Sequence, residues 1–151
     1  MLIGASGALN PEKDPRVNAV AVKMYEQFRN RKFDYVNVAR NTGFSVEQMV
    51  IVKNYVFMDC HEFNNGYTLF TASYEMAQSW QRLSEKTPDR ILAHDILMLQ
   101  HELYEIQLLL ANNGMSQQEA HTLAAKKYNY SAASRKYYRD LFNKPKEIDI
   151  F

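Results

Sequence analysis

Hydrophobic residues recur every three or four positions along most of the chain, the spacing of amphipathic helices. In the first such stretch they are Val17, Val20, Met24, Tyr25 and Phe28. Asp14 followed by Pro15 predicts the N-cap and the first residue of this helix. A shorter helix is expected from Asp34 through Val38, with Gly43 closing it in the left-handed conformation.

The next helix has a stronger start signal. Ser45 and Gln48 have the spacing of a capping box, and Phe44 can pack onto Met49 as a hydrophobic staple. We expect this helix to run to about Phe57.

Four later helices have their own start signals. The expected N-caps are Ser73, Asp95, Ser116 (in a capping box with Glu119) and Ser131. The Ser73 helix carries Tyr74, Ala77, Trp80 and Leu83 on one side and breaks at Thr87-Pro88-Asp89. Asp95 begins the longest helix, which Asn113-Gly114 ends, and the last helix reaches Phe142. Residues 60–70, with Asn64-Asn65-Gly66, predict a loop or short hairpin and are the only expected place for strands.

These signals predict an all-α fold in one domain spanning residues 1–151, with six or seven helices around a mostly buried central helix. Residues 1–12 and 144–151 are expected to be loosely ordered tails. Of the 151 residues, 46% are hydrophobic and 23% charged, as in ordinary globular proteins. No internal repeat or linker divides the chain.

Charge and cysteine content narrow the function classes. The formal net charge of +1 gives no broad electrostatic footprint for nucleic acid or an anionic membrane. Cys60 is the only cysteine, which excludes an internal disulfide and a cysteine-ligated zinc cluster. The N-terminus lacks the basic and apolar segments of a signal peptide, and no stretch has the roughly 20 apolar residues of a membrane span. We expect a cytoplasmic protein, or one exported without a cleavable signal, and no membrane partner.

The helix that begins near Asp95 carries the most suggestive polar residues. Its main apolar face is expected to be Ile96, Leu99, Leu103, Ile106 and Leu110, with further apolar strips on other sides. His101 and Glu105 lie one turn apart on a polar line. Asn112 falls on the same line, and so does His94 if the helix begins early enough.

Two interpretations of His101 and Glu105 remain open. They are metal ligands or an acid–base pair, because the i,i+4 spacing points both groups at one spot. Alternatively, Glu105 only accepts a hydrogen bond from a partly buried His101. The segment is similar to the His-Glu-x-x-His zinc motif, but Glu105 occupies the place of the second histidine. A third ligand would come from His121 or His61. Since such ligands lie on separate helices, zinc is disfavoured, no metal ligand is assigned and no cofactor is required.

Other residues are weaker candidates. His61 sits with Glu62 in the expected loop, where functional residues tend to collect. His121 is a candidate general base, although a packed or solvated histidine is the more ordinary interpretation. Trp80 and Arg82, with the tyrosines at 128, 130, 137 and 138, could stack on nucleobases, although aromatic residues at helical spacing more often form a core.

Residues 34–53 also fit a helix-turn-helix pattern, with Ala39 at the small position and Gly43 in the turn. The exposed side chains of the second helix would include Glu47, Gln48, Lys53 and Asn54. A single lysine complements the phosphate backbone poorly, so DNA binding is a minor alternative.

Several segments together carry a resemblance. They are the run from His94 to Glu105, Gly114-Met115-Ser116, Glu119-Ala120-His121, Tyr128-Asn129-Tyr130, Ala77 to Leu83 and Ala39 to Ser45. About two thirds of the chain thereby resembles C-terminal modules of bacterial polymorphic toxins and prophage minor-head-type proteins. The resemblance implies an effector delivered to a rival or host cell, with nucleic acid as a candidate substrate and an immunity protein as partner.

One residue departs from that family's pattern. The family has a histidine where this chain has Tyr55, in the segment Lys53-Asn54-Tyr55-Val56-Phe57. If that histidine performs the chemistry, this copy is weakened or inactive. Tyr55 could instead take over part of the role as a hydrogen-bond donor.

The leading hypothesis is a toxin-like effector that hydrolyses phosphodiesters by histidine acid–base chemistry. Its expected catalytic residues are His61, His94, His101, Glu105 and His121, and its expected binding residues are Lys53, Tyr55, Trp80 and Arg82. The alternatives are a non-catalytic protein-interaction module of phage origin and a helix-turn-helix DNA-binding protein. Convergence of the histidines in an open cleft would favour an enzyme, whereas scattering or burial in mutual hydrogen bonds would oppose one.

Overall fold

The computed structural model describes residues 2–3, 9–10, 14–63 and 66–143. The α-helices in this part of the chain are α1 (Pro15–Asn30), α2 (Asp34–Thr42), α3 (Val46–Lys53), α4 (Tyr74–Leu83), α5 (Ala93–Ala111), α6 (Gln117–Lys127) and α7 (Tyr130–Asn143). A π-helical turn, η2 (Asn54–Met58), continues α3. The strands are β1 (Leu2–Ile3), β2 (Leu9–Asn10), β3 (Cys60–Phe63) and β4 (Gly66–Leu69). The predicted all-α class is confirmed.

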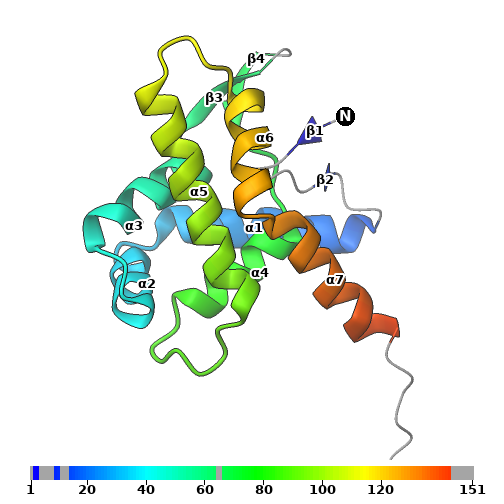
Figure 1. Cartoon of the computed structure of the whole chain (residues 1–151). Coiled ribbons are helices and arrows are strands. Elements are labelled where there is room, and N and C mark those ends of the chain that lie inside the picture. The colour runs from blue at the N-terminus through cyan, green and yellow to red at the C-terminus, as the bar shows by residue number, and fades with distance from the viewer. Residues whose placement is uncertain (1, 4–8, 11–13, 64–65, 144–151) are drawn as a thin grey trace, which may run out of the picture.

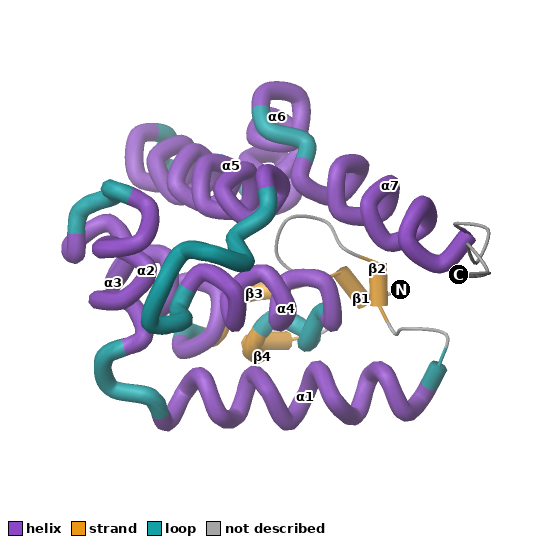
Figure 2. Tube along the Cα trace, turned by 90° about the horizontal axis from the view of Figure 1, so that it is seen from below, coloured by secondary structure: helices purple, strands orange, loops and turns teal. Residues whose placement is uncertain are grey.

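The helices pack around α5 and α4 (Figure 1). Seen from below, α1 forms one side of the molecule, α4 lies next to it, and α5, α6 and α7 lie on the far side of α4 (Figure 2). α6 runs back alongside α5, and the β3–β4 hairpin lies near the turn that joins these two helices (Figure 1). No described helix is long and apolar enough to cross a membrane.

Local signals set several helix ends as the sequence predicts. The carboxylate of Asp14 accepts the backbone N–H of Arg16. Ser45 and Gln48 form the reciprocal capping box, with hydrogen bonds of 3.0 Å in both directions. Gly43 closes α2 at φ +84°, a conformation that favours glycine.

Two predicted caps are wrong. α5 begins at Ala93, and Asp95 lies inside its first turn, where its Oδ2 accepts the N–H of Leu92 at 2.8 Å. Asp95 is buried and also binds Arg82. α7 begins before Ser131, and Asn129 Oδ1 accepts the N–H of Ala132 instead. In α7 Asn129 thus satisfies one first-turn N–H, whereas in α5 Asp95 binds the N–H of the N-cap residue and does not cap the helix.

Of the two alternatives predicted for residues 60–70, a loop or a short hairpin, the structure has the hairpin, with β3 antiparallel to β4 and Cys60 opposite Leu69. The prediction that strands occur only there is wrong, because Leu2–Ile3 pairs with Leu9–Asn10. Two-residue strands are too short to produce an alternating pattern. The predicted tails at 1–12 and 144–151 otherwise lie outside the described residues.

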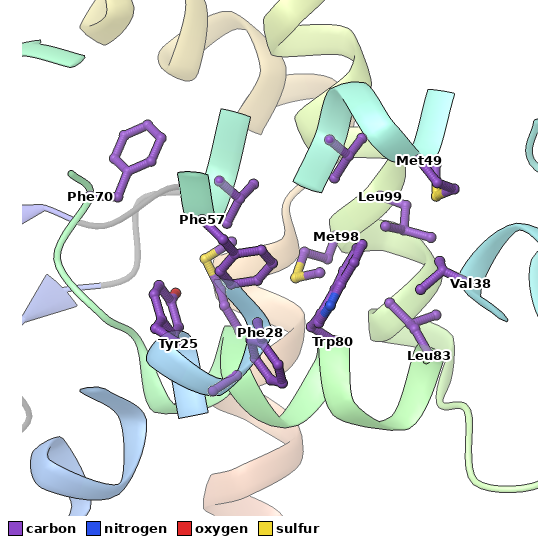
Figure 3. Close-up of a cluster of buried hydrophobic side chains, with 14 of the residues drawn as sticks. Tyr25, Phe28, Val38, Met49, Phe57, Phe70, Trp80, Leu83, Met98 and Leu99 are labelled. Atoms are coloured by element: carbon purple, nitrogen blue, oxygen red, sulfur yellow. The ribbon is translucent and has the colours of Figure 1, made fainter. Parts of the chain in front are cut away.

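An aromatic cluster forms the centre of the core (Figure 3). Phe57 packs against Phe28 at 5.2 Å and against Trp80 at 5.3 Å between ring centroids. Trp80 is completely buried, and its Nε1–H donates to Asp34 Oδ2 at 3.0 Å. The suggested stacking of Trp80 on nucleobases is therefore wrong.

Candidate functional site

The buried side of α5 is largely polar. His94, Asp95, His101, Glu102 and Glu105 are all buried on it. Leu110, assigned above to the main apolar face, is 81% exposed, so that assignment is wrong at the C-terminal end of the helix. The spacing of apolar residues predicts that one face of a helix is buried. Polar side chains that find hydrogen-bond partners on neighbouring helices can be buried as well, and they change which face that is.

Glu105 is the centre of a buried hydrogen-bonded group, here called the Glu105 cluster. Its Oε1 lies 3.2 Å from His101 Nε2 and 3.0 Å from His121 Nδ1. Its Oε2 accepts a hydrogen bond from the Tyr55 hydroxyl. The Gln117 side chain donates to that hydroxyl from Nε2 at 2.8 Å. The five side chains form one connected network.

Three segments of the chain supply these side chains. α5 carries His101 and Glu105 one turn apart, and α6 carries Gln117 and His121 with the same spacing. α6 begins at an N-cap formed by Ser116, which follows a turn with Gly114 at φ +91°. Because α6 packs alongside α5, its His121 reaches the Glu105 carboxylate. The π-turn η2 supplies Tyr55 from a third direction.

The hydrogen bonds fix the protonation of His101. Its Nδ1 lies 2.9 Å from the backbone carbonyl of Tyr128, which can only accept, so Nδ1 carries a hydrogen. The neutral ring would therefore point a lone pair from Nε2 at the Glu105 carboxylate. Burial lowers the pKa of His101, but the hydrogen bond to Glu105 and the charges of Glu102 and Glu105 raise it overall. When His101 is protonated and Glu105 is ionised, the Nε2–H of His101 donates a hydrogen bond to Glu105 Oε1.

The rest of the cluster agrees with an ionised Glu105. Burial favours the neutral acid, yet the hydrogen bonds from His101, His121 and Tyr55 lower the pKa of Glu105 to about 2. Burial and the Glu105 charge raise the pKa of Tyr55 far above its ordinary value, so the phenol keeps its proton and donates it. Tyr55 thus acts as a hydrogen-bond donor to the carboxylate.

An open pocket of about 620 Å³ lies beside the cluster. It is lined by His61, Glu62, Phe63, Leu109, Met115, Ser116 and Gln117. Gln117 connects the two, since it lines the pocket and donates to Tyr55. His61 Nε2 donates to the backbone carbonyl of Tyr55 at 2.7 Å, so the neutral ring carries its lone pair on Nδ1. His61 also packs on Phe70 at 4.2 Å between ring centroids.

His94 does not join these residues, which corrects the predicted grouping of all the histidines. It lies two turns before His101, in a second buried group with Arg82 and Asp95. Arg82 binds both carboxylate oxygens of Asp95 at 2.8 Å, and His94 Nε2 is 3.2 Å from Arg82 Nη2. Because the Arg82 guanidinium is held in this ion pair, its predicted role in binding nucleobases is disfavoured. Asn112, also placed on the polar line, is exposed and donates to Leu108 O.

Lys53 is likewise unavailable as a binding residue. It is only 5% exposed, and its Nζ lies 2.6 Å from Asp34 Oδ1. The prediction that Lys53 is exposed on a recognition helix is therefore wrong, although α2, Gly43 and α3 do form two packed helices joined by a tight turn. Without Lys53, the helix-turn-helix hypothesis loses its basic contact to the DNA backbone.

Sequence reasoning missed Gln117 and the Tyr128 carbonyl. Gln117 precedes His121 by four residues, and this spacing on one helix face was the only available signal for it. A backbone carbonyl has no sequence signature. Comparison of the chain with protein-family models, with curated proteins and with solved structures yields no match. The proposal for the function therefore rests on the geometry of the Glu105 cluster and its pocket.

Proposed function

We propose that this chain is a toxin-like effector domain that hydrolyses phosphodiester bonds in nucleic acid at the pocket beside the Glu105 cluster. One observation carries the proposal: His61 lines an open pocket that Gln117 and Tyr55 connect to a buried carboxylate holding two further histidines. Polar groups that converge next to a pocket are the usual arrangement of an active site.

In this mechanism, His61 is the general base. Its Nδ1 takes a proton from a water molecule, whose oxygen attacks phosphorus while the phosphorus–oxygen bond to the leaving group breaks. The leaving oxygen takes a proton from solvent, which gives a phosphomonoester and an alcohol. The contact of His61 with Tyr55 O holds the ring in the tautomer that this step requires.

The Glu105 cluster has a positioning role in this step. It joins α5, α6 and η2, and it holds Gln117 at the pocket wall through Tyr55. His101 and Glu105 are buried in mutual hydrogen bonds, whereas the His121 side chain is 18% exposed. Of these three residues, His121 is therefore the one that reaches solvent. An immunity protein that covers the pocket would be the natural partner.

The test is induced expression in bacteria, with growth and RNA integrity followed together with cleavage of RNA by the purified protein. His61→Ala should lower cleavage by about 100-fold or more, the usual contribution of a general base. Thr68→Ala is the matched control, because Thr68 pairs with His61 across the hairpin and is exposed. A folded wild-type protein that neither slows growth nor cleaves RNA would contradict the proposal.

A non-catalytic protein-interaction module is the second candidate. It is favoured by the complete burial of His101 and Glu105, which suits a structural hydrogen-bonded pair. This candidate expects no cleavage from the wild-type protein and no change of partner binding in His61→Ala.

A further inference from the structure

We propose that His101, Glu105 and His121 bind one divalent metal ion of the zinc class. The role of this ion as a cofactor rests on the proposed function. Its binding site rests on the positions of the three ligand atoms, and metal binding is tested without measuring cleavage.

The contact between His101 and Glu105 requires a positive species between them. Because the Tyr128 carbonyl holds the hydrogen on Nδ1, the Nε2 of a neutral His101 ring offers a lone pair. That lone pair faces a carboxylate oxygen at 3.2 Å. Two acceptors meet stably at this distance only around a proton or a cation. A metal-binding histidine usually donates its other N–H to a carbonyl or carboxylate, as His101 does to Tyr128.

The ligand atoms have nearly the spacing of a coordination sphere. Two ligands of a tetrahedral zinc ion, each at 2.0–2.1 Å, are about 3.3 Å apart. Glu105 Oε1 lies 3.2 Å from His101 Nε2 and 3.0 Å from His121 Nδ1. All three ligand atoms lie within 4.8 Å of one another, so small side-chain rotations suffice to enclose an ion. Although α5 supplies two of the ligands and α6 the third, the packing of these helices removes the objection to separate helices.

The donor set selects the class of metal. Two imidazoles and one carboxylate suit zinc and neighbouring transition metals, whereas magnesium prefers oxygen ligands alone. Three protein ligands leave a fourth position for water, as in catalytic zinc sites. An ion held by these residues would lower the pKa of a water bound at that position.

Groups around the ligands are arranged to support an ion and its water. Tyr55 donates to Glu105 Oε2, which leaves Oε1 for the metal. Gln117 donates to Tyr55 through Nε2, while its Oε1 is buried without a hydrogen-bond partner in the described part of the chain. A buried acceptor without a partner is costly, so this oxygen needs a donor that the described part of the chain does not supply.

The experiment is calorimetric titration of chelator-treated protein with Zn²⁺, with Mg²⁺ as the comparison. We expect one Zn²⁺ per chain and no measurable binding of Mg²⁺. Titration with Co²⁺ should give the visible absorption of a four-coordinate ion. His121→Ala should weaken Zn²⁺ binding by more than the roughly 10- to 100-fold expected for an outer-shell change such as Tyr55→Phe. His94→Gln is the matched control, a buried histidine outside the cluster that should leave one ion bound.

Circular dichroism and urea unfolding establish that each variant is folded. If His121→Ala does not fold, His121→Asn, which keeps a polar side chain at the partly exposed edge of the cluster, replaces it. No Zn²⁺ binding to folded wild-type protein would overturn the inference, as would binding that survives both His121→Ala and His121→Asn. Zinc bound at this site without cleavage of RNA would contradict the proposed function alone, whereas cleavage that persists in the zinc-free protein would contradict the metal as its cofactor.

Discussion

The Nδ1–H of His101 donates to the backbone carbonyl of Tyr128, 27 residues further along the chain, at 2.9 Å. Tyr128 is the C-cap residue that follows α6, and its own N–H donates to Ala124 O. The orientation of a ring on the central helix is thus set by the junction between α6 and α7. The chemistry of the Glu105 cluster depends on this distant backbone position.

His101→Ala should destabilise the protein strongly. The change leaves the buried Glu105 carboxylate without one of its partners and the Tyr128 carbonyl without its donor. Breaking a buried ion pair from one side costs about 3–5 kcal/mol. The free energy of unfolding from urea titration measures the loss. His61→Ala is the comparison, and a loss below about 1 kcal/mol for His101→Ala would show that the buried pair is unimportant.

Tyr55→Phe isolates the hydroxyl of Tyr55. It keeps the ring contacts with His61 and Phe70 but removes the hydrogen bonds to Glu105 and Gln117. We expect a loss of about 1–3 kcal/mol in the free energy of unfolding, because the buried acceptor loses its donor. An unchanged urea midpoint would mean that water replaces the hydroxyl without cost.

Tyr55→His restores the residue that the toxin resemblance places at this position. If the histidine takes part in proton transfer, RNA cleavage should rise by about 10-fold or more relative to the wild type. The double variant Tyr55→His with His61→Ala separates the two imidazoles. Equal cleavage by Tyr55→His and wild type would show that tyrosine at this position does not weaken the protein.

His94 predicts a pH dependence of stability. Burial, aided by the Arg82 charge and opposed by Asp95, lowers the pKa of His94 below its ordinary value of 6.5. The unfolded chain therefore binds a proton more readily than the folded one, and this residue's contribution to stability falls as the pH drops below about 6.5. The loss cannot exceed about 1.4 kcal/mol per pH unit for one proton.

Comparison of wild type with His94→Gln isolates this effect from the other histidines. Urea unfolding between pH 7.5 and 5 should show a smaller loss of stability in the variant. His101 acts in the opposite direction, because its folded pKa is raised, but it is common to both proteins. Parallel pH profiles for the two proteins would contradict the assignment.

Lys53→Met tests the buried ion pair with Asp34. The lysine also donates to the carbonyl of Arg31, while Asp34 accepts from Trp80. Removing the charge leaves a buried carboxylate with only its neutral partners, at a cost of about 3 kcal/mol or more. Lys126→Met, at an exposed position, should change the unfolding free energy by less than about 0.5 kcal/mol. Similar values for the two variants would contradict this role.

The sequence predicts those structural features that depend only on residues close together in the chain. The start of α1 at Asp14, the capping box at Ser45 and the left-handed Gly43 are each decided within a few residues, and all are present. Asp95 breaks the pattern because α5 begins earlier, at Ala93, and the Asp95 carboxylate binds Arg82 of α4 as well as the N–H of Leu92. The cap rules do not include such long-range partners.

The candidate site was predictable only in part. The i,i+4 spacing identifies His101 and Glu105 as neighbours, since both lie on one helix. The approach of His121 depends on how α6 packs on α5, and that of Tyr55 depends on a π-turn with no clear sequence pattern. His94 lies on the same helix seven residues before His101, about 10 Å away along the axis, and only its contact with Arg82 on α4 depends on packing that periodicity cannot supply.

The π-turn η2 has one further consequence, for how the site tolerates changes in chain length. Its wide turn is closed by the N–H of Asp59 donating to Asn54 O, five residues back, at 2.8 Å. Deleting one residue between Asn54 and Met58 would convert the wide turn to the ordinary helical period and move Tyr55 relative to the segments that flank the turn. Either Tyr55 would leave Glu105 or the hairpin bearing His61 would shift along the pocket. Related chains can therefore exchange residues in this turn, but the number of residues in it should stay constant.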